Sequence, residues 1–67
     1  MSQKAMEIVI KALVRMGVTK ANAVSISREL AYDISELVES EEGLDAIGET
    51  VERYGLSRKL VPYLLTA

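Results

Sequence analysis

Apolar residues recur every three or four positions along most of this chain, and in no stretch do they alternate with polar residues. The three-to-four spacing gathers apolar side chains on one face of an α-helix, whereas alternation would indicate a β-strand. The chain has 67 residues, which is enough for one small domain. We therefore predict an all-α fold, a compact bundle of three or four helices that forms a single domain over residues 1–67.

Glycine and hydroxyl residues divide the chain into helices. We expect the first helix from Ser2 to Met16, because Gly17 readily adopts the left-handed conformation that ends a helix. The Thr19 side chain can cap the next helix by accepting a hydrogen bond from a free backbone N–H. This second helix is expected over residues 20–39, where the apolar residues mark a single buried stripe.

The same signals predict two further helices in the second half of the chain. Ser40 is the expected cap of a third helix that reaches Tyr54, and Gly55 ends it. Ser57 can cap a short fourth helix. Pro62, the only proline, lies inside this last segment, where it is expected to distort or shorten the helix because proline lacks a backbone N–H.

The first expected helix is apolar around most of its circumference. Nine of the twelve residues from 5 to 16 are apolar, and the other three, Glu7, Lys11 and Arg15, lie four positions apart on one narrow stripe. A surface helix of a small domain needs an apolar stripe only somewhat wider than about 100°. We predict that the surplus forms a protein interface, although the helix could also be the central helix of the bundle. The predicted interface residues are Met6, Ile8, Val9, Ile10, Leu13 and Val14.

The charges are strongly segregated along the chain, although their sum is only −2. Residues 1–28 carry five bases and one acid, residues 29–52 carry nine acids and no base, and residues 53–67 carry three bases. Glu29, Asp33 and Glu36 share one helix face, where like charges repel by a few tenths of a kcal/mol per pair. Either solvent or a basic partner offsets this repulsion, and we predict these three residues as an acidic face for a partner. That partner could be the face of a neighbouring copy that carries Lys4, Lys11 and Arg15.

The composition argues against several kinds of chemistry. The chain has no cysteine and no histidine, so thiolate zinc ligands and the most common general base are both missing. We expect no catalytic residues, no metal and no cofactor. The most apolar stretch, residues 5–16, is too short to span a bilayer and is interrupted by charges. A cytoplasmic protein without a membrane partner is the expectation.

Residues 47–65 contain a more specific pattern. It has an apolar residue four positions before a turn glycine, an apolar residue after it, a capping serine and two buried positions, here Val51, Gly55, Leu56, Ser57, Val61 and Leu64. This pattern resembles the helix-turn-helix module of DNA-binding repressors, in which two helices meet near a right angle. The resemblance implies a helix-turn-helix-like corner at the C-terminal end. It also implies nucleic-acid contacts from Arg53, Arg58, Lys59 and Tyr63.

Two functions from different classes follow. The first is a small non-enzymatic interaction protein, an oligomerising adaptor or an accessory subunit, which binds itself as a homodimer or binds a larger protein. The alternative is a small helix-turn-helix DNA-binding regulator. The dependence of binding on salt separates them, because phosphate contacts release counterions and weaken steeply as salt rises.

Overall fold

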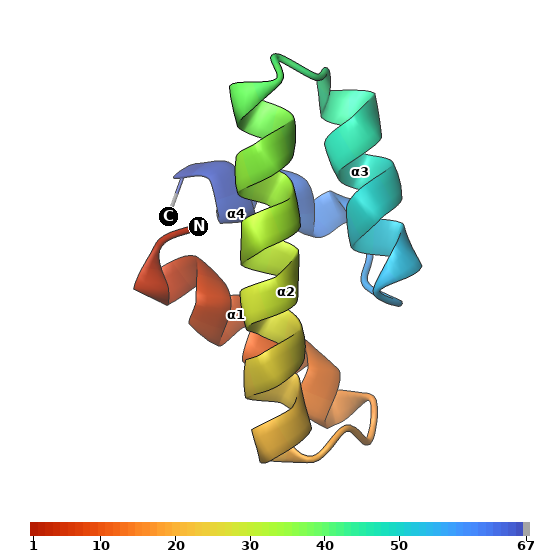
Figure 1. The fold of residues 1–67 in the computed structure, drawn as a ribbon. Helices are drawn as coiled ribbons and strands as arrows, with labels where there is room; N and C mark the ends of the chain where they lie inside the picture. The colour runs from red at the N-terminus through yellow and green to blue at the C-terminus, as the bar shows by residue number, and fades with distance from the viewer. Residues whose placement is uncertain (67) are drawn as a thin grey trace.

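A computed structural model describes residues 1–66, which form four α-helices and one 3₁₀ turn and contain no strand (Figure 1). The elements in chain order are α1 (Gln3–Arg15), α2 (Lys20–Glu39), α3 (Leu44–Arg53), η1 (Arg58–Leu60) and α4 (Val61–Thr66). The prediction of an all-α fold with four helices is confirmed. The predicted limits of the second helix agree with those of α2, and those of the first differ from α1 by one residue at each end.

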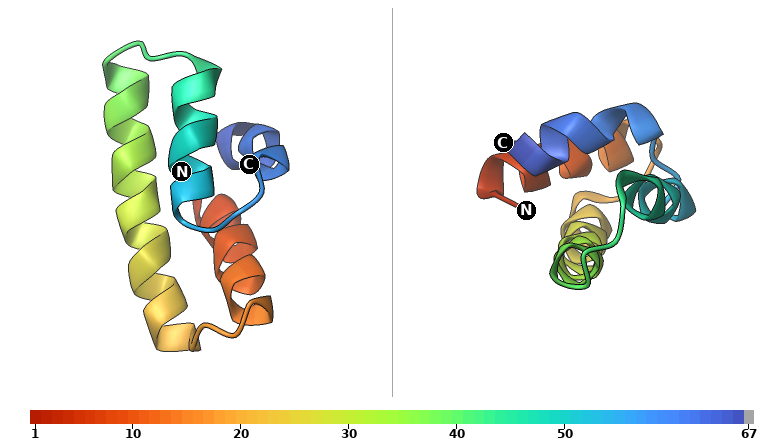
Figure 2. Two further views of the ribbon diagram at one scale, coloured as in Figure 1. Left: turned by 90° about the vertical axis from the view of Figure 1, so that its right-hand side faces the viewer. Right: turned by 90° about the horizontal axis from the view of Figure 1, so that it is seen from above.

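The helices form two crossed pairs. α2 and α3 run antiparallel beside each other, and α1 and the η1–α4 segment lie across them on one side (Figure 2). α2 has 20 residues and follows the long dimension of the molecule, which is 32 Å. α1 packs against both α2 and α4. As a result, two sides of α1 are covered by its own chain.

Every α-helix contributes side chains to a single core. Its larger members are Val9, Leu13, Leu30, Ile34, Ile47, Val51, Leu56, Val61 and Leu64. They include the buried positions expected from the helix-turn-helix pattern. The one buried polar side chain among residues 1–65, Ser27, donates a hydrogen bond of 2.8 Å to the carbonyl of Val24, so its hydroxyl is satisfied.

Two of the predicted caps are found, and one prediction is wrong. Thr19 accepts a hydrogen bond from the N–H of Asn22 at 3.3 Å, and Ser57 accepts one from the N–H of Lys59 at 3.2 Å. Ser40 does not cap the third helix. It follows the last residue of α2 and donates its hydroxyl proton to a carbonyl of that helix at 2.9 Å. α3 begins later, at Leu44, without a side-chain cap.

Three helices end in the same backbone turn, in which a carbonyl of the last turn accepts an N–H from five residues further on. The donor and acceptor pairs are Val18 and Leu13 (3.1 Å), Glu42 and Leu37 (2.9 Å), and Leu56 and Val51 (3.3 Å). This turn needs one residue with positive φ. Gly17 and Gly55 supply it after α1 and α3, with φ of 97° and 82°, but Glu41 supplies it after α2, with φ of 58°.

The last segment is divided in two, in agreement with the expectation for Pro62. A 3₁₀ turn over Arg58–Leu60 passes directly into α4, which has six residues. Pro62 is the second residue of α4. The first turn of a helix is where a missing N–H is best tolerated, because these groups have no acceptor within the helix.

Candidate functional site

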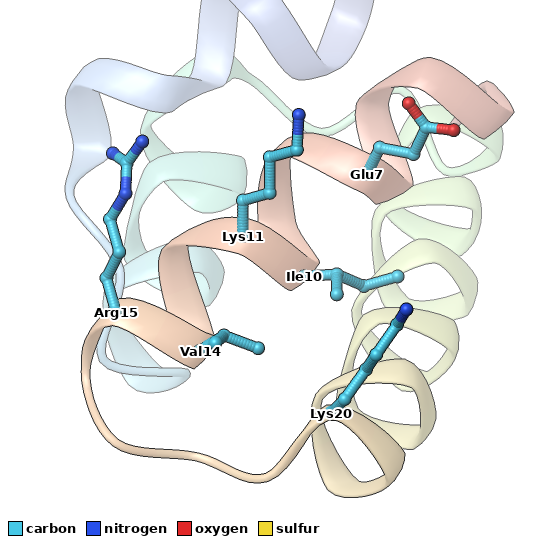
Figure 3. Close-up of a pocket in the computed structure, with 6 residues that line it drawn as sticks. All are labelled: Glu7, Ile10, Lys11, Val14, Arg15 and Lys20. Atoms are coloured by element: carbon cyan, nitrogen blue, oxygen red, sulfur yellow. The ribbon is translucent and has the colours of Figure 1, made fainter.

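A shallow groove of about 730 Å³ lies along the outer side of α1 and the first turn of α2 (Figure 3). Ile10 and Val14, one turn apart on α1, form its apolar floor and point toward the start of α2. Val14 is 44% exposed, a large fraction for a valine inside a helix of a small domain. Four charged side chains also line the groove: Lys20 faces the floor from α2, and Glu7, Lys11 and Arg15 extend from the adjoining face of α1. We call these six residues the α1 groove.

The turn after α1 brings the parts of the groove together. Gly17 reverses the chain, and the Thr19 cap starts α2 immediately afterwards. This places Lys20, the first residue of α2, beside the last turns of α1. Lys20 is not among the site residues predicted from the sequence. The short connection between two helices was the signal, because it makes them neighbours.

The structure corrects two of the predicted interface residues. Val9 and Leu13 are 0% and 2% exposed and belong to the core, so no partner can reach them. Met6, Ile8 and Ile10 are half-buried, and only Val14 is exposed. For Val9 and Leu13 the alternative interpretation therefore holds, in which this side of the first helix is buried within the bundle. The accessible apolar surface on this face is narrower than predicted and is centred on Ile10 and Val14.

Tyrosine hydroxyls bind two residues of the predicted acidic face. The hydroxyl of Tyr54 donates a hydrogen bond to the carboxylate of Asp33, and that of Tyr32 donates to Glu36 at 3.0 Å. The third residue, Glu29, lies with Asp33 and both tyrosines around a shallow pocket. Donors within the chain therefore relieve part of the repulsion between these carboxylates. Tyr32 and Glu36 are four positions apart, a spacing that could have indicated their bond, but Tyr54 and Asp33 are 21 positions apart, so no local pattern predicts theirs.

The bond to Asp33 makes the Tyr54 hydroxyl harder to ionise. It raises the pKa of Tyr54 to about 12, and desolvation and the charges of Asp33 and Glu29 act in the same direction. The hydrogen bond and charge of Glu36 likewise raise the pKa of Tyr32. Each tyrosine supports its carboxylate only while it keeps its proton.

Tyr54→Phe is expected to lower the free energy of unfolding by about 1 kcal/mol near neutral pH, because it removes the bond to Asp33. The raised pKa means that this stabilisation is complete below pH 10, the ordinary value for tyrosine, and is lost as pH rises through about 12. Urea denaturation of wild type and variant at several pH values measures the difference. It should shrink steadily above pH 10. A difference that stays constant up to pH 12 would contradict the assignment.

A second exposed apolar surface lies at the other end of α2, where the chain turns into α3. Val38 and Leu44 are 54% and 67% exposed there, although Val38 belongs to the expected second helix, whose apolar residues were predicted to form a single buried stripe. Four exposed acids belong to the same end of α2, the connection that follows it and the start of α3, namely Glu39, Glu41, Glu42 and Asp45. We call these six residues the acidic tip. The spacing of apolar residues did not predict the exposure of Val38 and Leu44. Such spacing indicates which face of a helix is apolar, but it does not indicate whether a neighbouring helix extends far enough to cover that face.

Two of the predicted nucleic-acid residues, Arg53 and Arg58, lie beside acids. Arg58 lies across Gly48 of α3, and its guanidinium binds Glu52 at 2.8 Å and approaches Asp45 at 3.8 Å. Arg53 lines a shallow pocket together with Asp33 and Glu36, so it also lies near acids. Lys59 and Tyr63 are exposed. Two of the three basic candidates therefore have carboxylates as neighbours.

The remaining findings concern metals, membranes and relatives. Within residues 1–66 no group of three or more potential ligand side chains is placed to hold a metal ion. None of the helices in that range is long and apolar enough to cross a membrane. No family model, no curated protein and no solved structure matches the chain. The interpretation of the α1 groove therefore depends on its own chemistry.

Proposed function

We propose that this protein is a small non-enzymatic interaction module, an oligomerising adaptor or accessory subunit, that binds an acidic and apolar protein segment in the α1 groove. One observation carries the proposal: Ile10 and Val14 form an apolar strip along the groove, with Lys20 facing it from α2 and with Lys11 and Arg15 on the adjoining face of α1. An apolar floor with a charged rim is the usual anatomy of a protein-binding surface. The excess of positive charge on the rim favours a partner with carboxylates.

The two kinds of contact have different tasks. Covering the exposed part of an aliphatic side chain contributes about 1 kcal/mol, so the floor supplies most of the affinity. Exposed ion pairs add only about 0–1 kcal/mol each, but they set partner choice and the association rate. Association also costs several kcal/mol of lost freedom. We therefore expect a weak complex, with a dissociation constant on the order of millimolar, whose affinity falls only moderately as salt rises.

A titration of the ¹⁵N-labelled protein tests the proposal. The probe is a synthetic amphipathic helical peptide with leucines on one face and glutamates beside them. Its control is the same peptide with lysine in place of every glutamate. The acidic peptide is expected to shift the amide signals of Ile10, Val14 and Lys20, and the basic peptide is not. If both peptides bind alike, or if neither reaches these residues, the proposal is wrong.

Val14→Glu is the matching variant, because it places a carboxylate in the floor of the groove. We expect it to weaken binding of the acidic peptide by about tenfold or more. Leu65→Glu is the control, since Leu65 is 41% exposed, close to the value for Val14, and lies outside the groove. It should bind the peptide like wild type. Equal losses in both variants would indicate a general charge effect and would contradict a specific groove.

The second candidate, a DNA-binding regulator, has its support in the glycine turn between α3 and η1 and in the exposed Lys59 and Tyr63. It requires Arg58 to leave its two carboxylates, which reduces the gain from any phosphate contact. Sedimentation with a random-sequence duplex at about 50 mM salt tests it. We expect no co-sedimentation. Binding that disappears by about 200 mM salt would instead favour this candidate.

A further inference from the structure

We infer that the occupant of the α1 groove is the acidic tip of a second copy, so that copies of this chain associate head to tail. The inference rests on the proposed function, because it assumes that the groove accepts acidic and apolar segments. It adds the identity of the partner. Both halves of the contact are then present on one molecule.

The two surfaces lie at opposite ends of the molecule. α2 begins beside the groove with Lys20 and ends at the acidic tip with Glu39 (Figure 1). Because α2 follows the 32 Å long dimension, one copy can offer its groove to one neighbour and its tip to another at the same time. The direction of growth would be roughly that of α2.

The chemistry of the two surfaces is complementary. The tip presents the exposed side chains of Val38 and Leu44 together with four acids. In the part of the chain that the structure describes, only Asp45 of these acids has a cation beside it, Arg58 at 3.8 Å. The groove presents Ile10 and Val14 among three cations and one acid. Joining them places apolar side chains against apolar side chains and carboxylates against cations.

The same charges disfavour a two-fold symmetric dimer through either surface. Groove against groove would bring three cations of each copy together, and tip against tip would bring together four carboxylates of each copy. Like charges facing each other across an interface are repulsive. A contact between two different surfaces is heterologous and produces open chains, or rings where the rotation closes.

The contact is small, so the association is expected to be weak. Four aliphatic side chains form its centre. A stable interface buries roughly 1,000 Å² or more of surface, which four side chains alone do not provide. Most of the charged groups remain near solvent, where salt screens them. We therefore expect a series of oligomers that grows with protein concentration at about 50 mM salt and dissociates at about 1 M salt.

Two blocked variants test the contact by sedimentation velocity over about a hundredfold range of concentration at low salt. Val14→Glu blocks the groove and leaves the tip intact, and Leu44→Glu blocks the tip and leaves the groove intact. Both positions are exposed, so the fold is retained. Each variant alone is expected to associate at least about tenfold more weakly than wild type. An equimolar mixture has one intact groove and one intact tip per pair, so it should associate again and stop at a one-to-one complex.

The controls separate the possible failures. Tyr63→Glu, which is 62% exposed and outside both surfaces, should associate like wild type; a loss equal to that of the blocked variants would overturn the inference. It would also be overturned if Leu44→Glu associated normally, because the groove would then pair with itself. A wild-type protein that stays monomeric while its groove binds the acidic peptide overturns the head-to-tail contact and leaves the proposed function in place. Failure of the peptide as well rejects both.

Discussion

Replacing Leu30 with alanine is expected to lower the free energy of unfolding by about 3 kcal/mol. Leu30 lies in the middle of α2 and has no exposed surface. Its truncation loses the transfer free energy of the removed carbons and leaves a cavity that the surrounding helices fill only in part. Small domains have a total stability of about 5 kcal/mol. More than half of the stability would therefore be lost with this one side chain.

Urea denaturation followed by circular dichroism measures this loss. Leu65→Ala is the matched control, because it removes the same atoms from a side chain that is 41% exposed. We expect it to cost less than about 1 kcal/mol. Similar losses for the two variants would show that Leu30 is not part of a close-packed core.

Gly55→Ala is expected to cost about 1–2 kcal/mol, because an alanine must adopt the left-handed conformation that glycine takes without strain. Gly55 has a φ of 82° in the turn between α3 and η1. A β-carbon there would also lie 3.3 Å from the end of the Met16 side chain, which can move aside. The cost should therefore come from the backbone. Gly55→Asn, which tolerates positive φ better, should recover part of the stability.

The turn after α2 provides the opposite experiment. Glu41 occupies the left-handed position there, so Glu41→Gly removes strain of about 1–2 kcal/mol. Glycine also increases the conformational entropy of the unfolded chain, which lowers this gain in stability by about 0.4–1 kcal/mol. We expect a net stabilisation of about 0.8 kcal/mol, the middle of the resulting range. Thermal unfolding of both variants measures these changes in stability. If Glu41→Gly loses stability, or if Gly55→Ala loses none, the turns are not strained as described.

The helices themselves could be predicted because local signals decide them. Thr19 forms the predicted hydrogen bond, and Gly17 and Gly55 occupy the predicted turns. The error at Ser40 has a physical reason. A serine near a helix end can accept from a free N–H of the next helix or donate to a carbonyl of the previous one, and the sequence does not distinguish these roles. The turn at Glu41 could not be predicted from the sequence either, because glutamate rarely adopts positive φ.

The site was harder to predict because it depends on what covers each face. Periodicity identified α1 as unusually apolar, but only the packing of α2 and α4 shows that Val9 and Leu13 are buried and Val14 is not. The position of the Arg58 side chain depends on Gly48, because a residue without a side chain leaves room for the guanidinium on α3. Contacts of this kind join residues that are far apart in the sequence. Local sequence patterns therefore do not predict these contacts.

The charges at the two ends of α2 have the same sign as the ends of its own helix dipole. Lys20 stands at the positive end of the helix macrodipole, and Glu36 and Glu39 stand in the last turn at its negative end. This arrangement opposes the usual preference for acids at the start of a helix and bases at its end, at a cost of about 0.3–1 kcal/mol per charge. Salt screens this conflict within the chain. It would also screen the charge attraction in the proposed head-to-tail contact. We therefore expect rising ionic strength to relieve the unfavourable charges at the ends of α2 and, at the same time, to weaken the proposed contact between copies.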